Sequence, residues 1–137
     1  MKKFNQIVAY FPAIGMSVYL IMFTAAASMD PGGSENIQTA TDGYSFFHNF
    51  LCDTNNEFTH SGLKNNGKVL ANLAHIVLSL TMMSFFYVMP NIFNHSNRNT
   101  KLIKILGVLA MAIFTFMYQE ELHDLVVTLV GVFASMA

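Results

Sequence analysis

The chain has 137 residues, of which 53% are hydrophobic and 11% charged, and its formal net charge is −1. Soluble domains carry about 25% charged residues, so the composition indicates a membrane protein and argues against a soluble globular domain. Because the net charge is near zero, the chain lacks the excess of basic residues that is typical of nucleic-acid-binding proteins. Cys52 is the single cysteine, which excludes an intramolecular disulfide.

The first predicted element is a membrane span over residues 7–28, which carry no charged side chain and follow Lys2 and Lys3. As a helix this run is about 33 Å long, enough to cross a hydrocarbon core of roughly 30 Å. A cleaved signal peptide is the alternative, with the alanines at 25–27 as its cleavage site. The run exceeds the usual signal core of roughly 7–15 residues, which favours a retained anchor.

Residues 29–68 form a long polar segment, bounded by the turn-forming runs 30–33 and 64–68. About 40 residues without regular structure are unusual in a compact protein, so we expect a short helix or re-entrant segment over residues 44–51. The aromatic side chains of this stretch would lie at the membrane surface, where amphipathic rings are favoured. They are Tyr44, Phe46, Phe47 and Phe50.

A second span is predicted over residues 69–89, because the apolar run stops at Pro90. Within it, Asn72, His75 and Ser79 recur at the spacing that places them on one face of a helix. A polar stripe inside a span faces protein or water rather than lipid. We therefore expect this face to point into the helical bundle.

A third span is predicted over residues 102–118, after a basic connector that contains His95. An acidic turn follows, and residues 122–137 form the fourth predicted span. Its purely apolar part is only about 20 Å long as a helix, so we expect that the natural chain continues or that the span draws in the turn. The predicted fold class is all-α: a single membrane domain of about four transmembrane helices, with a long outer loop between the first two.

The distribution of Lys and Arg predicts the orientation of the chain. Cytoplasmic loops carry an excess of these residues, which places the N-terminus in the cytoplasm and residues 29–68 outside the inner (plasma) membrane. The inner set is then Lys2, Lys3, Arg98, Lys101 and Lys104, and the outer set is Lys64 and Lys68. Every acidic residue falls on the outer side, as does every histidine except His95.

This topology predicts a pocket at the outer rim of the bundle, where polar residues of the loop, the second span and the acidic turn would converge. The candidate residues are His48, Asp53, Asn72, His75, Glu120, His123 and Asp124. The structural alternative is that His75 packs in the bundle, that His48 and Asp53 fix the loop, and that the acidic turn is merely solvated. His60 and His95 are interpreted as surface residues.

Two functions follow from such a pocket. The first is an integral membrane protein without an assigned activity that binds the headgroup of a membrane lipid. The second is a metal-dependent lipid amide or ester hydrolase, with zinc as cofactor and His48, Asp53, His75 and His123 as candidate ligands. No HExxH pair or comparable tight ligand motif supports the second function. Membrane lipid is the expected partner, nucleic acid is not, and a homo-oligomer is left open.

Residues 44–53, with the sequence YSFFHNFLCD, are followed by Asn65-Asn66-Gly67 and then by a span. This layout resembles bacterial polytopic proteins of unknown function related to the DRAM-like membrane family, whose eukaryotic relatives include GPI-lipid-remodelling proteins. Members share a first span, a long outer loop that ends in a Ser/Cys-Asp motif, and more spans than are seen here. The resemblance therefore implies an N-terminal part of such a protein, with a lipid-linked or membrane-regulatory role. The family's usual glycine soon after the loop aspartate is replaced here by Thr54 and Asn55.

Overall fold

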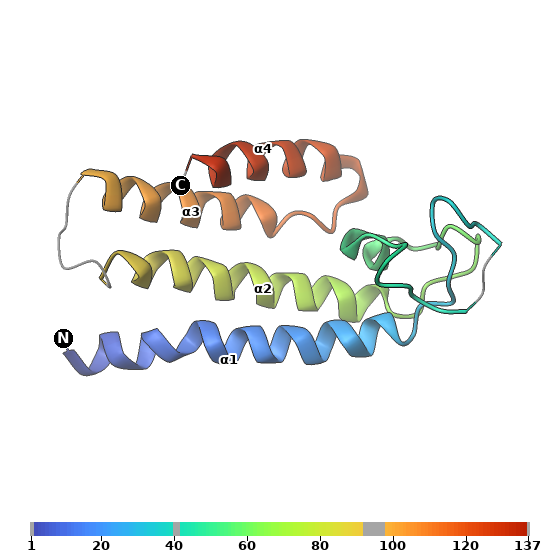
Figure 1. Cartoon of the computed structure of the whole chain (residues 1–137), viewed down its shortest axis with the longest axis horizontal. Coiled ribbons are helices and arrows are strands. Elements are labelled where there is room, and N and C mark those ends of the chain that lie inside the picture. The colour runs from blue at the N-terminus through green and yellow to red at the C-terminus, as the bar shows by residue number, and fades with distance from the viewer. Residues whose placement is uncertain (1, 40–41, 92–97, 137) are drawn as a thin grey trace. The chain divides into compact units, whose positions relative to one another are not determined.

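The computed structural model describes residues 2–39, 42–91 and 98–136, and the side chains at positions 2–9, 91 and 120 fall outside that description. His95 of the basic connector therefore lies outside the described residues. The elements are helices α1 (Lys2–Ala27), α2 (Lys68–Val88), α3 (Arg98–Phe114) and α4 (His123–Ser135), with short 3₁₀ turns η1 (Leu51–Asn55), η2 (Met89–Asn91) and η3 (Glu120–Leu122) (Figure 1). Only two isolated β-bridges accompany them in the described part. The expected all-helical fold class is confirmed.

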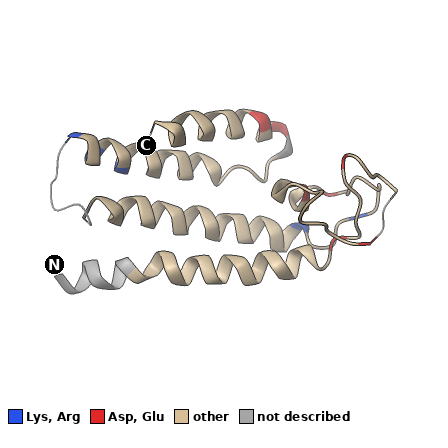
Figure 2. Ribbon diagram, in the orientation of Figure 1, with Lys and Arg blue, Asp and Glu red and all other residues tan. Residues whose placement is uncertain are grey.

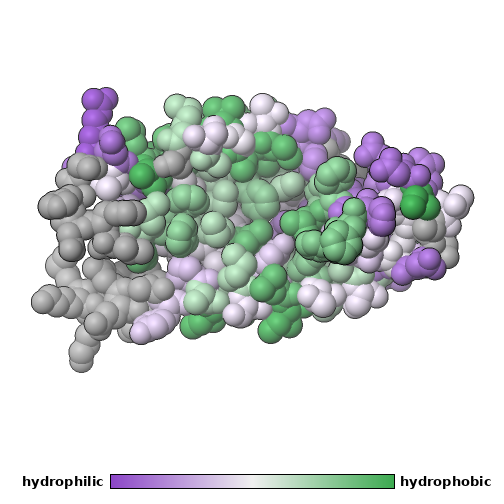
Figure 3. Space-filling model, in the orientation of Figure 1, coloured by the Kyte–Doolittle hydropathy of each residue, from purple (hydrophilic) through white to green (hydrophobic). Residues whose placement is uncertain are grey.

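Two of the helices are long and apolar enough to cross a membrane, over Tyr10–Ala27 and Lys68–Val88. Only 17% of the first stretch and 28% of the second are buried within the protein. Most of the apolar surface of these two helices is therefore not covered by the described residues of the chain. Figure 2 shows that α2 carries a charged residue only at its start, and Figure 3 shows apolar side chains along the helices. These features agree with a membrane association of α1 and α2.

Of the other two helices, α3 is as long as the predicted span but begins and ends four residues earlier, and α4 is shorter than predicted. Helix α3 has 17 residues and α4 has 13, which correspond to about 25 Å and about 20 Å. Helix α3 also ends at Phe114, four residues before the predicted end, because the backbone then tightens into i→i−3 hydrogen bonds such as Phe116 N to Ile113 O and Met117 N to Phe114 O.

The chain divides into two compact units. We call Met1–Val18 with His75–Ala137 the helical unit and Tyr19–Ala74 the loop unit. Each unit is described by itself below.

Close helix contacts at glycines hold the helical unit together. A Cβ on Gly15 would overlap the hydroxyl of Thr81, so α1 and α2 approach closely at that point. A Cβ on Gly107 would overlap the ring of Phe86, which fixes the approach of α3 to α2. Helix α4 packs on α3. Small residues of this kind let helix backbones approach, as is common in membrane bundles.

The loop unit consists of the end of α1, the connecting segment over residues 28–67, and the start of α2. Residues 28–67 fold back on themselves, because the backbone of Gly67 lies against the carbonyl of Ala26 with no room for a Cβ. Inside the unit, the rings of Phe23 and Tyr44 meet edge to face with centroids 5.8 Å apart. The connecting segment thus contacts the end of α1 through Tyr44, near its middle, and through Gly67, at its end.

Candidate functional site

The loop unit contains a cavity of about 410 Å³ within the connecting segment. This volume lies in the range of roughly 300–1,000 Å³ that is usual for small-molecule sites. The cavity is lined by Gly33, Ser34, Ile37, Asp42, Gly43, Tyr44, Ser45, His48 and Asn49. Asp42 supplies a carboxylate, and none of the described residues that line the cavity is a lysine or an arginine.

Glycines shape the two walls of this cavity. Gly33 and Gly43 have φ angles of +97° and +87°, which residues with a side chain adopt only under strain. Gly32 forms an isolated parallel bridge to Gly43, and this bridge brings residues near 33 and residues near 44 together. The sequence signal for this geometry is the Gly32-Gly33 pair within the turn-forming run.

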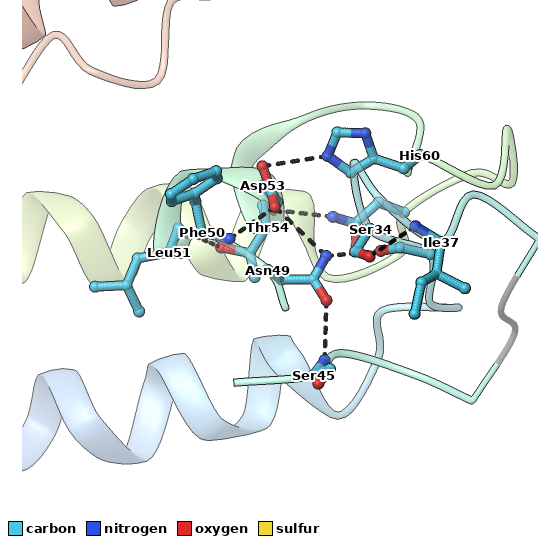
Figure 4. Close-up of polar contacts among 11 residues, drawn as sticks. Ser34, Ile37, Ser45, Asn49, Phe50, Leu51, Asp53, Thr54 and His60 are labelled. Carbon is cyan, nitrogen blue, oxygen red and sulfur yellow. Dashed lines mark hydrogen bonds and ion pairs between the residues drawn. The ribbon is translucent and has the colours of Figure 1, made fainter. Parts of the chain in front are cut away.

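Asn49 joins the two walls through both atoms of its side-chain amide. Its Nδ2 donates to the carbonyl of Gly33 over 2.6 Å, and its Oδ1 accepts a hydrogen bond from the backbone N–H of Ser45 over 3.0 Å (Figure 4). Nδ2 also lies 3.4 Å from Oδ2 of Asp53. Asn49 is not among the candidate site residues predicted from the sequence. Asn is nevertheless a common turn residue, because its side chain forms hydrogen bonds with the nearby backbone.

His48 lies at the cavity with an exposed ring. Its Nδ1 is 2.8 Å from the hydroxyl of Ser45, which also lines the cavity. The imidazole and this hydroxyl therefore form a polar pair at the cavity wall. Of the candidates predicted from the sequence, His48 is the one that lines the cavity directly.

Asp53 lies behind the cavity and organises the turn that leads into η1. Its Oδ2 accepts a hydrogen bond from the backbone N–H of Phe50 over 2.8 Å, and its Oδ1 lies 3.5 Å from Nε2 of His60. Figure 4 shows Asp53 between Asn49 and His60. His60, interpreted from the sequence as a surface residue, is partly exposed, and its Nε2 atom is buried beside this carboxylate.

The short helix expected over residues 44–51 forms further along the chain. Residues 46–48 make a turn instead, and the 3₁₀ helix runs over Leu51–Asn55. The side chain of Asn49 captures backbone groups that a helix would need, and Phe50 is extended with φ −78° and ψ 154°. Polar side chains that bond to the local backbone compete with helix formation in this way.

Several ionisable groups lie in the cavity wall or behind it. Burial raises the pKa of the Asp30 carboxyl, and the nearby Asp53 raises it further, while the N–H of Gly32 and the ring of His60 act in the opposite direction. Burial, together with the neighbouring acids, raises the pKa of the Tyr44 hydroxyl to about 12. The hydroxyl of Tyr44 is buried and finds no hydrogen-bond partner among the described residues. Tyr44 therefore stays neutral at physiological pH.

The turn next to the cavity exposes a group of large apolar side chains. Phe46, Phe47 and Phe50 are 71%, 89% and 64% exposed, although they alternate in sequence with residues that line the cavity. The rings of Phe46 and Phe47 meet edge to face with centroids 5.6 Å apart. These rings form an exposed apolar cluster on the turn beside the cavity.

The remaining candidates are divided between the two units. Asn72 belongs to the loop unit, and its buried Oδ1 has no hydrogen-bond partner within the described part of the chain. His75 belongs to the helical unit, where it is buried beside the ring of Phe114 with centroids 5.9 Å apart. One turn further along α2, the hydroxyl of Ser79 donates to the carbonyl of Met111.

The acidic turn lies at the start of α4 in the helical unit. Nδ1 of His123 is 3.1 Å from Oδ1 of Asp124, and the Asp124 side chain is fully exposed. The side chain of Glu120 lies outside the described part of the chain. An adjacent, exposed His–Asp pair of this kind is weakly coupled and marks no defined site by itself.

No group of three or more His, Cys, Asp or Glu side chains suited to a metal ion occurs among the described residues. A catalytic zinc site needs three protein ligands. The hydrolase hypothesis, with His48, Asp53, His75 and His123 as ligands, therefore stays a prediction without geometric support from the described side chains.

Comparison with family models, with curated proteins and with solved structures gives no match to this chain. The resemblance to the DRAM-like membrane family therefore stays a prediction. Function must be argued from the cavity and its surroundings.

Proposed function

We propose that this chain is an integral membrane protein that binds the headgroup of an amine-bearing phospholipid in the cavity of the connecting segment. In this proposal α1 to α4 are membrane helices, the N-terminus lies in the cytoplasm of the inner membrane, and residues 28–67 face outside. The orientation rests on the excess of Lys and Arg in the cytoplasmic parts. The single observation that carries the headgroup site is the cavity flanked by exposed phenylalanines.

The phenylalanines support a lipid rather than a soluble ligand. Along residues 44–50, side chains that line the cavity alternate with the exposed rings of Phe46, Phe47 and Phe50. Apolar aromatic side chains partition into the membrane interface. Insertion of these rings into the outer leaflet would hold the cavity at the depth of the headgroups, next to its ligand.

The charges around the cavity support an amine. Asp42 lines it, and the carboxylate of Asp53 lies behind Asn49 at 3.4 Å from that amide. Without a lysine or arginine among its described lining residues, the cavity favours a cation over a simple anion. The hydroxyls of Ser34 and Ser45 supply donors for the phosphate of the same headgroup.

Lipid binding is tested with the full chain in nanodiscs that contain equal amounts of phosphatidylethanolamine and phosphatidylglycerol. Lipid that remains bound after detergent extraction is measured by mass spectrometry, and ethanolamine lipid is expected to dominate. Asp42→Asn should lower its retention several-fold, because the carboxylate facing the amine is lost. The matched control is Glu35→Gln, which removes the same charge from an exposed position of the same segment. Equal retention in both variants would contradict the site.

The position of the aromatic turn is tested separately. The chain contains no tryptophan, so Phe47→Trp introduces a single reporter. In vesicles with brominated acyl chains its fluorescence is expected to be quenched. Unquenched fluorescence that responds to iodide in the water would show that the turn is away from the membrane, and it would overturn the lipid assignment of the cavity.

A further inference from the structure

A second, apolar groove lies in the helical unit, between the end of α2 and residues 104–112 of α3. Its volume is about 320 Å³, and it is lined by Tyr87, Lys104, Ile105, Val108, Leu109 and Ala112. Apart from Lys104 and the ring of Tyr87, the described residues that line it are all aliphatic. Ile105 and Leu109 are 61% and 41% exposed, so the groove opens onto the outer surface of the helices.

Lys104 places a positive charge at this groove. Its Nζ lies 3.6 Å from the centre of the Tyr87 ring, so the ammonium is held by a cation–π contact between α3 and α2. Lys101 lies one turn earlier on α3 and Arg98 one turn before that, and both are exposed. No acidic residue occurs in α3. The groove is thus apolar along its length and basic near the start of α3.

From this combination we infer that the groove is a binding site for one anionic phospholipid. An acyl chain lies along Ile105, Val108 and Leu109, and the phosphate is bound by Lys104. An aliphatic groove on a membrane helix accommodates an acyl chain, and basic residues next to it select an anionic headgroup. In the proposed orientation this site is in the cytoplasmic leaflet, where anionic lipids attract basic residues.

This inference rests on membrane embedding but not on the headgroup cavity of the connecting segment. The two sites use different residues and select opposite charges, so each can fail without the other. A helix from a second copy of the chain is the competing occupant of the groove. That alternative requires no anionic headgroup and predicts a change of oligomeric state when the groove is altered.

The charge of the site is tested by binding of phosphatidylglycerol to the full chain in nanodiscs, with phosphatidylcholine as the background lipid. One basic residue near the membrane surface contributes about 1 kcal/mol to anionic lipid binding, so Lys104→Gln should weaken it about fivefold. Lys104→Arg should retain it. Lys101→Gln, an equal charge loss outside the groove, should weaken it much less. Equal losses at positions 101 and 104 would mean diffuse attraction and would overturn the site.

The groove itself is tested with all charges kept. Ala112→Phe fills the groove and should reduce phosphatidylglycerol binding to the level of Lys104→Gln, whereas Ala134→Phe adds the same ring at an exposed position of α4 and should not. Helical content by circular dichroism shows whether each variant is folded. If Ala112→Phe does not fold, Ala112→Leu, which adds a smaller side chain to the groove, takes its place. Unchanged lipid binding in a folded filled variant, or a loss of oligomers instead of lipid, would overturn the inference.

Discussion

Oδ1 of Asp53 lies 3.5 Å from Nε2 of His60, seven residues further along the connecting segment. The same carboxylate accepts the backbone N–H of Phe50 over 2.8 Å. One side chain therefore fixes the start of η1 and also holds the turn that carries His60. This makes Asp53 a structural residue of the wall behind the cavity, whatever binds in front of it.

The two contacts of Asp53 predict unequal effects of substitution. Asp53→Ala removes a backbone acceptor and should destabilise the connecting segment by about 1 kcal/mol. His60→Ala removes only a partly exposed ion pair, which is worth roughly 0–1 kcal/mol. Hydrogen exchange of residues 45–60 measures both, with His48→Ala as the control for loss of an exposed imidazole. Faster exchange in His60→Ala than in Asp53→Ala would contradict this ranking.

Asp30 predicts a pH-dependent stability. Its pKa is raised above the usual value of 3.8 by burial, so its ionisation opposes folding, and this cost appears as the pH rises through the folded-state pKa. Asp30→Asn should therefore raise the thermal unfolding midpoint at pH 7, because an amide oxygen can still accept the N–H of Gly32.

The gain from Asp30→Asn should shrink as the pH falls from the raised folded-state pKa toward the usual value of 3.8, and it should vanish well below 3.8, where the wild-type carboxyl is protonated in both the folded and unfolded states. Glu35→Gln, at an exposed position, should show no such trend. A pH-independent gain at Asp30 would exclude ionisation as the cause.

Cys52 is expected to react slowly. Burial and the neighbouring Asp53 raise the pKa of its thiol, and the thiolate is the reactive species. Iodoacetamide at pH 8 should alkylate Cys52 more slowly than glutathione. Asp53→Asn should increase the rate, because it removes the negative charge and keeps an acceptor for Phe50. A rate equal to that of glutathione in the wild type would show that the thiol is unperturbed.

The glycine contacts of the helical unit predict opposite effects at two positions. Gly107→Leu should destabilise the protein by about 1–3 kcal/mol, because the ring of Phe86 occupies the space that the new side chain needs. At Gly131 in α4, a Cβ meets no heavy atom of the described residues within 4 Å. Gly131→Ala should stabilise by roughly 0.5–1 kcal/mol through helix propensity. Thermal unfolding in a mild detergent measures both.

The proposed topology predicts which side of the membrane each connection faces. In a Cys52→Ser background, Glu35→Cys should react with an impermeant maleimide added to intact cells, whereas Lys101→Cys should react only after permeabilisation. Both positions are exposed, so access to the reagent depends on the side of the membrane. The reverse pattern would place the connecting segment in the cytoplasm.

The long apolar helices could be predicted from the sequence to within a few residues. The charge-free run 7–28 covers α1 except for its first turn, residues 2–6, and the predicted span 69–89 is nearly the same as Lys68–Val88. Apolar runs bounded by lysine or proline define such helices by themselves. The end of α3 could not be predicted, because Thr115 and Phe116 are still apolar enough to continue a helix while the backbone has already tightened.

The organisation of the connecting segment was only partly predictable. The turn-forming runs were visible, and Asp30 and Asn65 make side-chain bonds to Gly32 and Gly67 that are usual for these residues two positions ahead. The pairing of Asp53 with His60 and the bridge by Asn49 were not visible, because each depends on a chain reversal that no local pattern specifies. Of the predicted candidates, His48 lines the cavity and Asp53 lies behind it.

The contact between Gly67 and the carbonyl of Ala26 gives residues 28–67 the character of a transplantable module. A segment whose two ends meet can be excised and replaced by a short turn, or moved between two antiparallel helices of another protein, without stretching the chain on either side. Insertions and exchanges at this one junction would then change the connecting segment while leaving the helices α1 and α2 untouched.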